Sequence, residues 1–309
     1  FRGFGGQTGY WDAALESFTL TGALAAATKN VKLIASSAIL SLPPAVVARM
    51  VATLDNVAPG RIGGNIVTGW QPAEYTQQGL WPGDEYFGYR YDYASEYCTV
   101  LRDLWTTGRC DLKGQHFTME DCHLAPRPTS RIPIVAAGQS PRGMRFAADH
   151  ADYSFTFCTG VNTPTAFTGT NQKLAEAAAV SGRDVGAYVL VMVIADDTDD
   201  LAMKKWQHYS DHADVDALSW MAEQSGRDTG AAETASAKRI NLPAGAVNQN
   251  VGTLVGSYAT VARLLDEMAA VPGTKGIMLS FDDYDTGIDV FGEKIQPLMR
   301  CREHVQAAA

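Results

Sequence analysis

Short apolar runs alternate with amphipathic stretches along most of this 309-residue chain. The apolar runs are rich in β-branched residues and have the length of strands buried on both faces. They lie at 31–40, 61–69, 132–138, 152–157, 188–195 and 275–281. Helix-like patterns fall between them, among them 43–57, 91–108, 140–151, 168–182 and 258–271. This alternation predicts a parallel sheet covered by helices.

We expect this α/β sheet to be a TIM-type (β/α)8 barrel rather than an open doubly wound sheet. Six strands that share one layer pattern fit the barrel slightly better, and no G-x-G-x-x-G motif follows an early strand. The chain opens at Phe1 with a Gly-rich loop that leads into a helix, without a strand before it. The first βα unit is therefore expected upstream of Phe1, and residues 1–309 are expected to form a single barrel domain.

Composition narrows the class of protein. The net charge is -9, so the basic surface of a nucleic-acid binder is not expected. No apolar run approaches the ~18 residues of a membrane span. The five cysteines form no C-x-x-C pair, which favours inert thiols in a reducing cytoplasm. The segment 227–250 has no clear period and is expected to be a long excursion, either mobile filler or a lid.

Polar residues gather where the second predicted strand ends. In a parallel barrel the loops after the strands meet at one rim, where ligands bind. Asn65 lies within the strand, where an amide favours a ligand contact. Ser36, in the preceding strand, is either satisfied by its own backbone or a donor to a ligand. Glu74, Arg90 and Tyr91 follow in polar sequence and are either solvated surface or contacts to phosphate, carboxylate or sugar-like hydroxyls.

The sequence "AAGQSPRG" predicts a strand, a Gly turn and a helix that starts at Ser140. Ser140 is a suitable N-cap, with Pro141 at the first helical position. The same geometry offers free N–H groups and a hydroxyl to a phosphate, and both interpretations hold together.

Other reaction classes lack their motifs. His208 and His212 are four residues apart, but no H-E-x-x-H pattern supports a metal site. No G-x-S-x-G elbow indicates a serine hydrolase. A cofactor that brings its own reactivity fits such a site best.

The stretches "NIVTGWQ", "LWPGDEYF", "AGQS" and "GVNTPTAF" resemble the bacterial-luciferase-like, flavin-dependent monooxygenases, in particular those that open pyrimidine rings. The resemblance runs from residue 2 to about residue 302 in matching order. It implies a TIM-type barrel that binds reduced FMN delivered by a separate NADH-dependent flavin reductase. With O2, such an enzyme opens the ring of uracil or thymine to a ureidoacrylate-type product.

The resemblance also implies roles for single residues. Asn65, Glu74, Arg90, Tyr91 and Ser140 match the family's flavin-binding positions, with Ser140 at the FMN phosphate. Asn65 would lie with Ser36 beside the isoalloxazine and hydrogen-bond the reacting oxygen in a water-poor pocket. Gly64 stands where the family has a larger aliphatic residue, a change that would enlarge the pocket or loosen the strand.

Two alternatives stay open at the level of sequence. One is a sibling monooxygenase acting on another heterocycle or on a sulfonated or amino-carboxylate compound. The other is a non-catalytic flavin-binding protein. The family also implies a homo-oligomer, either a dimer or a tetramer.

Overall fold

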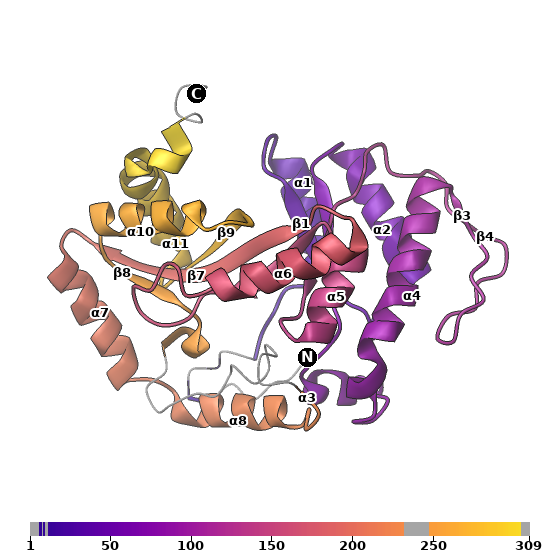
Figure 1. Cartoon of the computed structure of the whole chain (residues 1–309), viewed down its shortest axis with the longest axis horizontal. Coiled ribbons are helices and arrows are strands. Elements are labelled where there is room, and N and C mark those ends of the chain that lie inside the picture. Colours follow the sequence, from indigo (N-terminus) through magenta and orange to yellow (C-terminus); the bar gives the residue numbers. More distant parts are fainter. Residues whose placement is uncertain (1–5, 8, 10–11, 232–246, 304–309) are drawn as a thin grey trace.

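The structure is a computed structural model that describes residues 6–7, 9, 12–231 and 247–303 (Figure 1). In this part of the chain, seven parallel strands form one sheet. They are β1 (Leu33–Ala38), β2 (Ile62–Val67), β5 (Ile134–Ala137), β6 (Tyr153–Phe157), β7 (Gly186–Asp196), β8 (Thr253–Ser257) and β9 (Thr274–Phe281). Parallel pairing brings the carboxyl ends of neighbouring strands to one edge, which is where ligands bind in barrels of this kind.

The strand β7 is the centre of the second half of the sheet. Its first half, from Gly186 to Leu190, pairs with β6, and its second half, from Met192 onward, pairs with β8. The strand β9 runs along the other side of β7. Among the described residues no pairing joins β1 to β8 or β9. The βα unit expected upstream of Phe1 stays a prediction.

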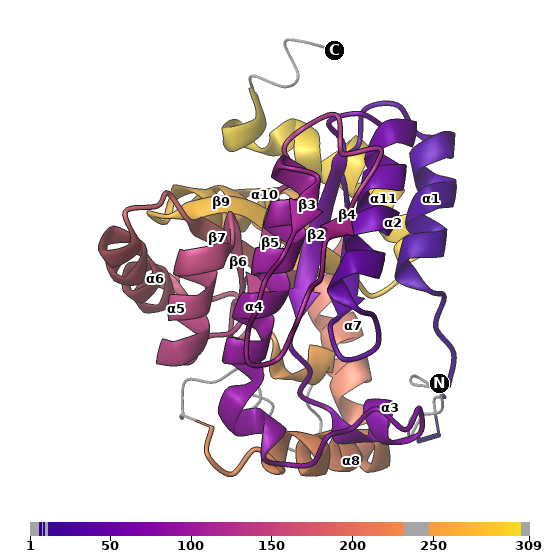
Figure 2. The same ribbon diagram turned by 90° about the vertical axis from the view of Figure 1, so that its right-hand side faces the viewer.

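Helices cover the outer face of the sheet, as Figures 1 and 2 show. The described helices are α1 (Ser17–Ala27), α2 (Pro44–Val57), α3 (Pro72–Thr76), α4 (Tyr86–Thr106), α5 (Pro141–His150), α6 (Thr168–Ser181), α7 (Asp199–Asp211), α8 (Val215–Gly226), α10 (Tyr258–Ala270) and α11 (Tyr284–Val290), and of these α3 and α8 do not lie on the outer face. Single turns follow at η1 (Val247–Asn250), η2 (Phe291–Ile295), η3 (Gln296–Leu298) and η4 (Arg300–Arg302). In both figures α3 and α8 lie next to each other at one end of the sheet, and the backbone N–H of Ala73 donates to Gln224 Oε1 at 3.2 Å.

The main core lies between the sheet and these helices. The helix α2 begins with Pro44 at its first position and repeats apolar residues at Val47, Val51 and Leu54, all of which are buried. The longer α4 buries Leu101 and Leu104 in the same cluster. The helix layer therefore holds β1, β2 and β5 in place from outside and leaves their other face for the site.

The six predicted strands are confirmed within a few residues. The strand β8 was missed because its five residues include Gly and Ser, and so was the antiparallel pair β3 (Arg109–Cys110) and β4 (Cys122–His123). The two-residue strands β3 and β4 carry too few residues to show a period. The middle of the predicted excursion, 232–246, lies outside the described residues.

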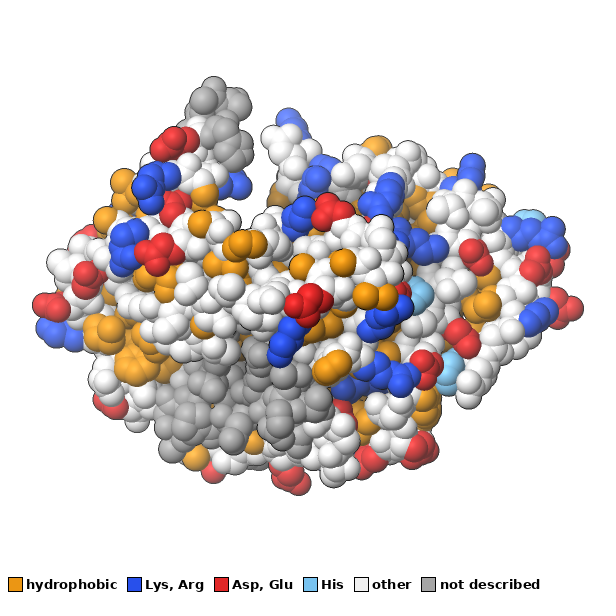
Figure 3. All heavy atoms as spheres, viewed as in Figure 1, with side chains coloured by type: hydrophobic (Ala, Val, Ile, Leu, Met, Phe, Trp, Pro, Cys, Tyr) orange, Lys and Arg blue, Asp and Glu red, His pale blue; other side chains and the backbone are white. Residues whose placement is uncertain are grey.

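None of the described helices is long and apolar enough to cross a membrane. On the face shown in Figure 3, acidic and basic side chains are mixed over the described surface.

Candidate functional site

Four of the residues singled out by sequence lie around one cavity of about 290 Å³ at the carboxyl ends of β2, β5 and β6. They are Asn65, Arg90, Tyr91 and Ser140. Phe155 and Phe157 of β6 line the same cavity. The structure thus gives one concave space both polar groups and aromatic walls, as small-molecule sites commonly have.

Asn65 and Ser36 are direct neighbours across β1 and β2. They are register partners, and Asn65 Nδ2 donates to Ser36 Oγ at 3.0 Å. Side chains alternate along a strand, so Asn65 faces the cavity and its neighbour Gly64 faces the other way. The Oδ1 atom of Asn65 is buried and has no hydrogen-bond partner in the described structure. Ser36 therefore joins the site through Asn65, without lining the cavity itself.

Ser140 lies in the turn between β5 and α5. Its Oγ accepts from the backbone N–H of Gly143 at 3.1 Å, and Pro141 occupies the first helical position. The predicted N-cap is confirmed. Tyr91 packs tightly on this turn: a Cβ added to Gly143 would lie 2.7 Å from the Tyr91 hydroxyl oxygen. A Cβ on Gly138 would lie 2.6 Å from the same atom, so glycine is required at both positions.

Arg90 reaches the cavity from α4. Its Nη2 atom lies 2.9 Å from Asp228 Oδ2, and both side chains are under a tenth exposed. The guanidinium also lies over the rings of Phe87 and Tyr91, 5.5 and 5.3 Å from their centroids. Asp228 comes two residues after α8, so this ion pair fastens the start of the predicted excursion to the cavity wall.

Glu74 lies apart from this group. It is in the first turn of α3, half-buried, and does not line the cavity. Burial raises the pKa of Glu74, so its charge is less favourable than that of an exposed carboxylate. Its role as a flavin contact stays a prediction.

Several residues that line the cavity were missed from the sequence. Gln139 is 1% exposed, and both polar atoms of its amide are without a hydrogen-bond partner in the described structure. The sequence leaves Trp70 and Trp81 open between cavity wall and plain packing, and Trp70 lines the cavity. Trp81, by contrast, packs against Tyr75 and Phe87. A polar residue two positions after a strand was the available signal for Gln139, because strand ends meet at this edge.

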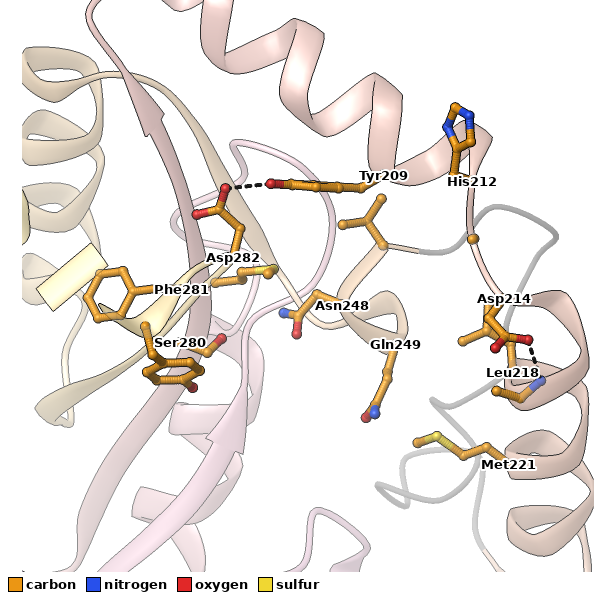
Figure 4. A pocket seen from close by; sticks show the side chains of 15 residues that line it. Tyr209, His212, Asp214, Leu218, Met221, Asn248, Gln249, Ser280, Phe281 and Asp282 are labelled. Carbon is orange, nitrogen blue, oxygen red and sulfur yellow. Dashed lines mark hydrogen bonds between the residues drawn. The ribbon is translucent and has the colours of Figure 1, made fainter. Parts of the chain in front are cut away.

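A second cavity of about 620 Å³ adjoins the first, and Met221 and Gln249 line both. Figure 4 shows Tyr209 of α7 and Asp282, which follows β9, pointing toward each other. The Tyr209 hydroxyl donates to Asp282 Oδ2 at 2.8 Å. Burial, with this hydrogen bond, raises the pKa of Tyr209 to about 12, so the hydroxyl stays protonated at neutral pH. This hydrogen bond joins α7 to the segment after β9, two parts of the cavity wall that are distant in sequence.

Residues 4–275 match the family of luciferase-like monooxygenases. The chain belongs to this family. Pyrimidine monooxygenase RutA of Bradyrhizobium sp. (strain BTAi1) is 61% identical over 97% of this chain and 84% of the relative. RutA of Cronobacter sakazakii is 58% identical over 99% of this chain and 90% of the relative. These matches span nearly every element of the described fold.

Solved structures share the fold at lower identity. EDTA monooxygenase EmoA from Chelativorans sp. BNC1 gives a TM-score of 0.78 at 16% identity, over 94% of this chain and 78% of that one. Long-chain alkane monooxygenase LadA gives 0.76 at 23% identity, over 94% and 74%. The α/β barrel class predicted from the sequence is confirmed.

Luciferase-like monooxygenases are flavin-dependent, and the cavity fits a flat heteroaromatic ligand with a charged tail. Asn65 and Gln139 line it and carry unpartnered amide atoms, and Phe155 and Phe157 supply flat apolar walls. The turn at Ser140 presents the N-terminus of a ten-residue helix, which favours an anion.

Proposed function

We propose that this luciferase-like monooxygenase opens the ring of uracil or thymine with reduced FMN and O2, giving a ureidoacrylate-type product. The observation that carries the proposal is the identity of 58–61% with two RutA proteins over at least 97% of this chain. Such identity over the whole cavity-bearing fold supports a shared substrate class. The chain would act as a single barrel domain in pyrimidine catabolism.

The residues of the cavity have separate tasks in this proposal. The Ser140 hydroxyl, with the positive end of the α5 dipole, would hold the FMN phosphate, because Pro141 lacks an N–H and the Gly143 N–H is already bonded to Ser140 Oγ. Arg90 and Tyr91 form the wall beside it. Glu74 lies outside this lining, and its role as an acceptor for the ribityl hydroxyls rests on the resemblance alone. When bound, reduced FMN supplies the electrons that activate O2. Its placement at this cavity is supported by the unpartnered amides and the helix N-terminus.

Asn65 and Ser36 orient oxygen in this account. The Nδ2 atom of Asn65 is held by Ser36 Oγ, so the amide plane is fixed before any ligand enters. The second N–H of Nδ2 is left to donate to oxygen, and a fixed donor costs little reorganisation when negative charge develops there. Phe155, Phe157 and Met221 keep water from this region.

The reduced cofactor requires a partner, which we propose to be a separate NADH-dependent flavin reductase. A cytoplasmic location and a homo-oligomer, either dimer or tetramer, belong to the same proposal. The free state of all five cysteines supports a reducing compartment.

The test is uracil consumption by the purified protein with FMN, a flavin reductase, NADH and O2, followed by mass spectrometry. Asn65→Ala is expected to lose at least about 100-fold in rate, as removal of one preorganised donor does. Asn30→Ala, at an exposed position, is the control and keeps full rate. Oxidation of another heterocycle or a sulfonated compound, with uracil untouched, would favour the sibling activity. FMN binding without turnover would favour the non-catalytic flavin protein.

A further inference from the structure

The amide of Gln139 is the most completely unsatisfied polar group in the described cavity wall. The side chain is 1% exposed, and neither Nε2 nor Oε1 has a hydrogen-bond partner within the described structure. Burying an amide without partners is unfavourable, so native proteins nearly always supply them. A ligand in the cavity that Gln139 lines is the available source.

The backbone fixes where this amide lies. Gly138 adopts a φ of +149°, which glycine favours, and Ser140 and Pro141 start α5 directly after Gln139. The turn is also confined by Tyr91, which leaves no space for a Cβ on Gly138. Gln139 is therefore presented from a constrained turn, as a specific contact requires.

A carboxamide carries a donor and an acceptor side by side in one plane. Its complement is a ring edge with an N–H next to a carbonyl, the imide edge of a pyrimidine-dione. Both amide atoms are then satisfied by one ligand. The aromatic walls of Phe155 and Phe157 suit the flat faces of the same ring.

We propose that the Gln139 carboxamide binds the imide edge of a pyrimidine ring, accepting from the ring N–H through Oε1 and donating to the adjacent carbonyl through Nε2. This inference rests on the proposed function, in which two molecules carry that edge. One is the substrate, uracil or thymine, and the other is the pyrimidine part of the flavin ring. Gln139 is thus a specificity-determining residue for a pyrimidine-dione.

The experiment compares Gln139→Met, which keeps the length and removes both hydrogen-bonding groups, with Gln139→Glu, which replaces the donor. Gln172→Met on α6 is the control, because Gln172 is exposed and bonds only to Glu176 among the described residues. FMN affinity is measured by quenching of flavin fluorescence. Uracil affinity is measured by calorimetry on the FMN-loaded protein, with 3-methyluracil, which lacks the imide N–H, as a second probe.

Loss of two neutral hydrogen bonds predicts a fall of about 10-fold or more in affinity for the ligand that Gln139 contacts. Weaker FMN binding in both variants assigns the edge to the flavin. Weaker uracil binding at unchanged FMN affinity, with a smaller preference for uracil over 3-methyluracil, assigns it to the substrate. Unchanged affinity for both ligands in folded variants overturns the proposal.

Thermal melting separates these outcomes from damage to the fold. The amide has no protein partner in the described residues, so Gln139→Met is expected to melt no lower than the parent protein. If the parent protein binds FMN but neither binds nor consumes uracil, the proposed function is wrong. The FMN affinities of the Gln139 variants still show in that case whether Gln139 contacts the flavin.

Discussion

Arg90 and Asp228 form a buried ion pair, with 2.9 Å between Nη2 and Oδ2, that ties the end of α8 to the cavity. The side chains are 9% and 6% exposed, so each charge depends on the other. Asp228→Ala is expected to lower the free energy of unfolding by ~3–5 kcal/mol, because it leaves Arg90 buried and unpaired. Urea unfolding measures this loss.

A neighbouring pair gives the control for that prediction. Arg227 and Asp84 approach to 2.8 Å but are 41% and 49% exposed. Arg227→Ala is expected to cost only ~0–1 kcal/mol. Equal losses in Asp228→Ala and Arg227→Ala would contradict the view that burial makes the Arg90 pair important.

Ser140 is expected both to cap a helix and to bind phosphate, whereas Ser257 is expected only to cap a helix. Ser140 and Ser257 each cap a helix, accepting from the N–H of Gly143 at 3.1 Å and of Thr260 at 3.3 Å. Either Ser→Ala change is expected to cost ~1 kcal/mol of stability. Only Ser140→Ala is expected to weaken FMN binding, by about 10-fold, measured by flavin fluorescence. Similar FMN affinity in the two variants would remove Ser140 from the proposed phosphate site.

Close packing at the turn between β5 and α5 is expected to make a Gly→Ala change there destabilising, whereas the same change in an open part of α4 is expected to be stabilising. Ala is normally better than Gly in a helix by up to ~1 kcal/mol. Gly88→Ala in α4 meets open space and is expected to stabilise the protein. Gly143→Ala in α5 meets the Tyr91 hydroxyl at 2.7 Å and the Gly138 backbone at 2.8 Å, so it is expected to destabilise. If the melting temperature rises in both variants, the Tyr91 side chain can move aside without cost, which would contradict this prediction.

Gly64 follows the same reasoning. A Cβ there meets nothing within 4 Å, and the residue faces away from the cavity. The structure thus favours a looser strand over an enlarged pocket as the consequence of this glycine. Gly64→Ala is expected to raise the melting temperature and leave uracil affinity unchanged.

Asp55 makes the stability depend on pH in the acid range. Burial alone would raise the pKa of Asp55, but hydrogen bonds from the side chains of Ser130 and Thr129 and from the N–H of Gly60 lower it overall. A lowered pKa in the folded state gives stability above the ordinary value of ~3.9, lost as the pH falls through the folded value. These bonds also hold the loop that leads into β5.

Asp55→Asn tests that dependence. At pH 7 the free energy of unfolding of the variant is expected to be ~1.5–3 kcal/mol below that of the parent, since hydrogen bonds to a charged acceptor are strong. Below pH ~4 the parent loses this contribution and the variant does not, so the difference between them is expected to shrink. Urea unfolding across this pH range gives both values. Asp184→Asn, with a side chain 84% exposed, should follow the parent curve. A difference between Asp55→Asn and the parent that is constant across pH would contradict the assigned cause.

The sequence predicted the site where strand order determines position. Asn65 lies near the end of β2 and Ser140 at the start of α5, and a parallel sheet brings such positions to one edge. Arg90 and Tyr91 reach the same edge from the first two turns of α4. Asp228 could not be found this way, because its partner lies 138 positions earlier and the pair depends on how α8 docks. Gln139 was not singled out because the neighbouring Ser140 has a clear role as a helix N-cap. Glu74 shows the converse, since a charge close in sequence to Asn65 does not line the cavity.

Labelled oxygen tests the central claim, that the chain is a pyrimidine monooxygenase, most directly. The purified protein is supplied with uracil, FMN, a flavin reductase and NADH under ¹⁸O2, and the product is analysed by mass spectrometry. The account predicts a ring-opened product that carries ¹⁸O derived from O2, formed by the parent protein and lost in Asn65→Ala. Unchanged uracil, or a product whose new oxygen comes from water, would contradict it.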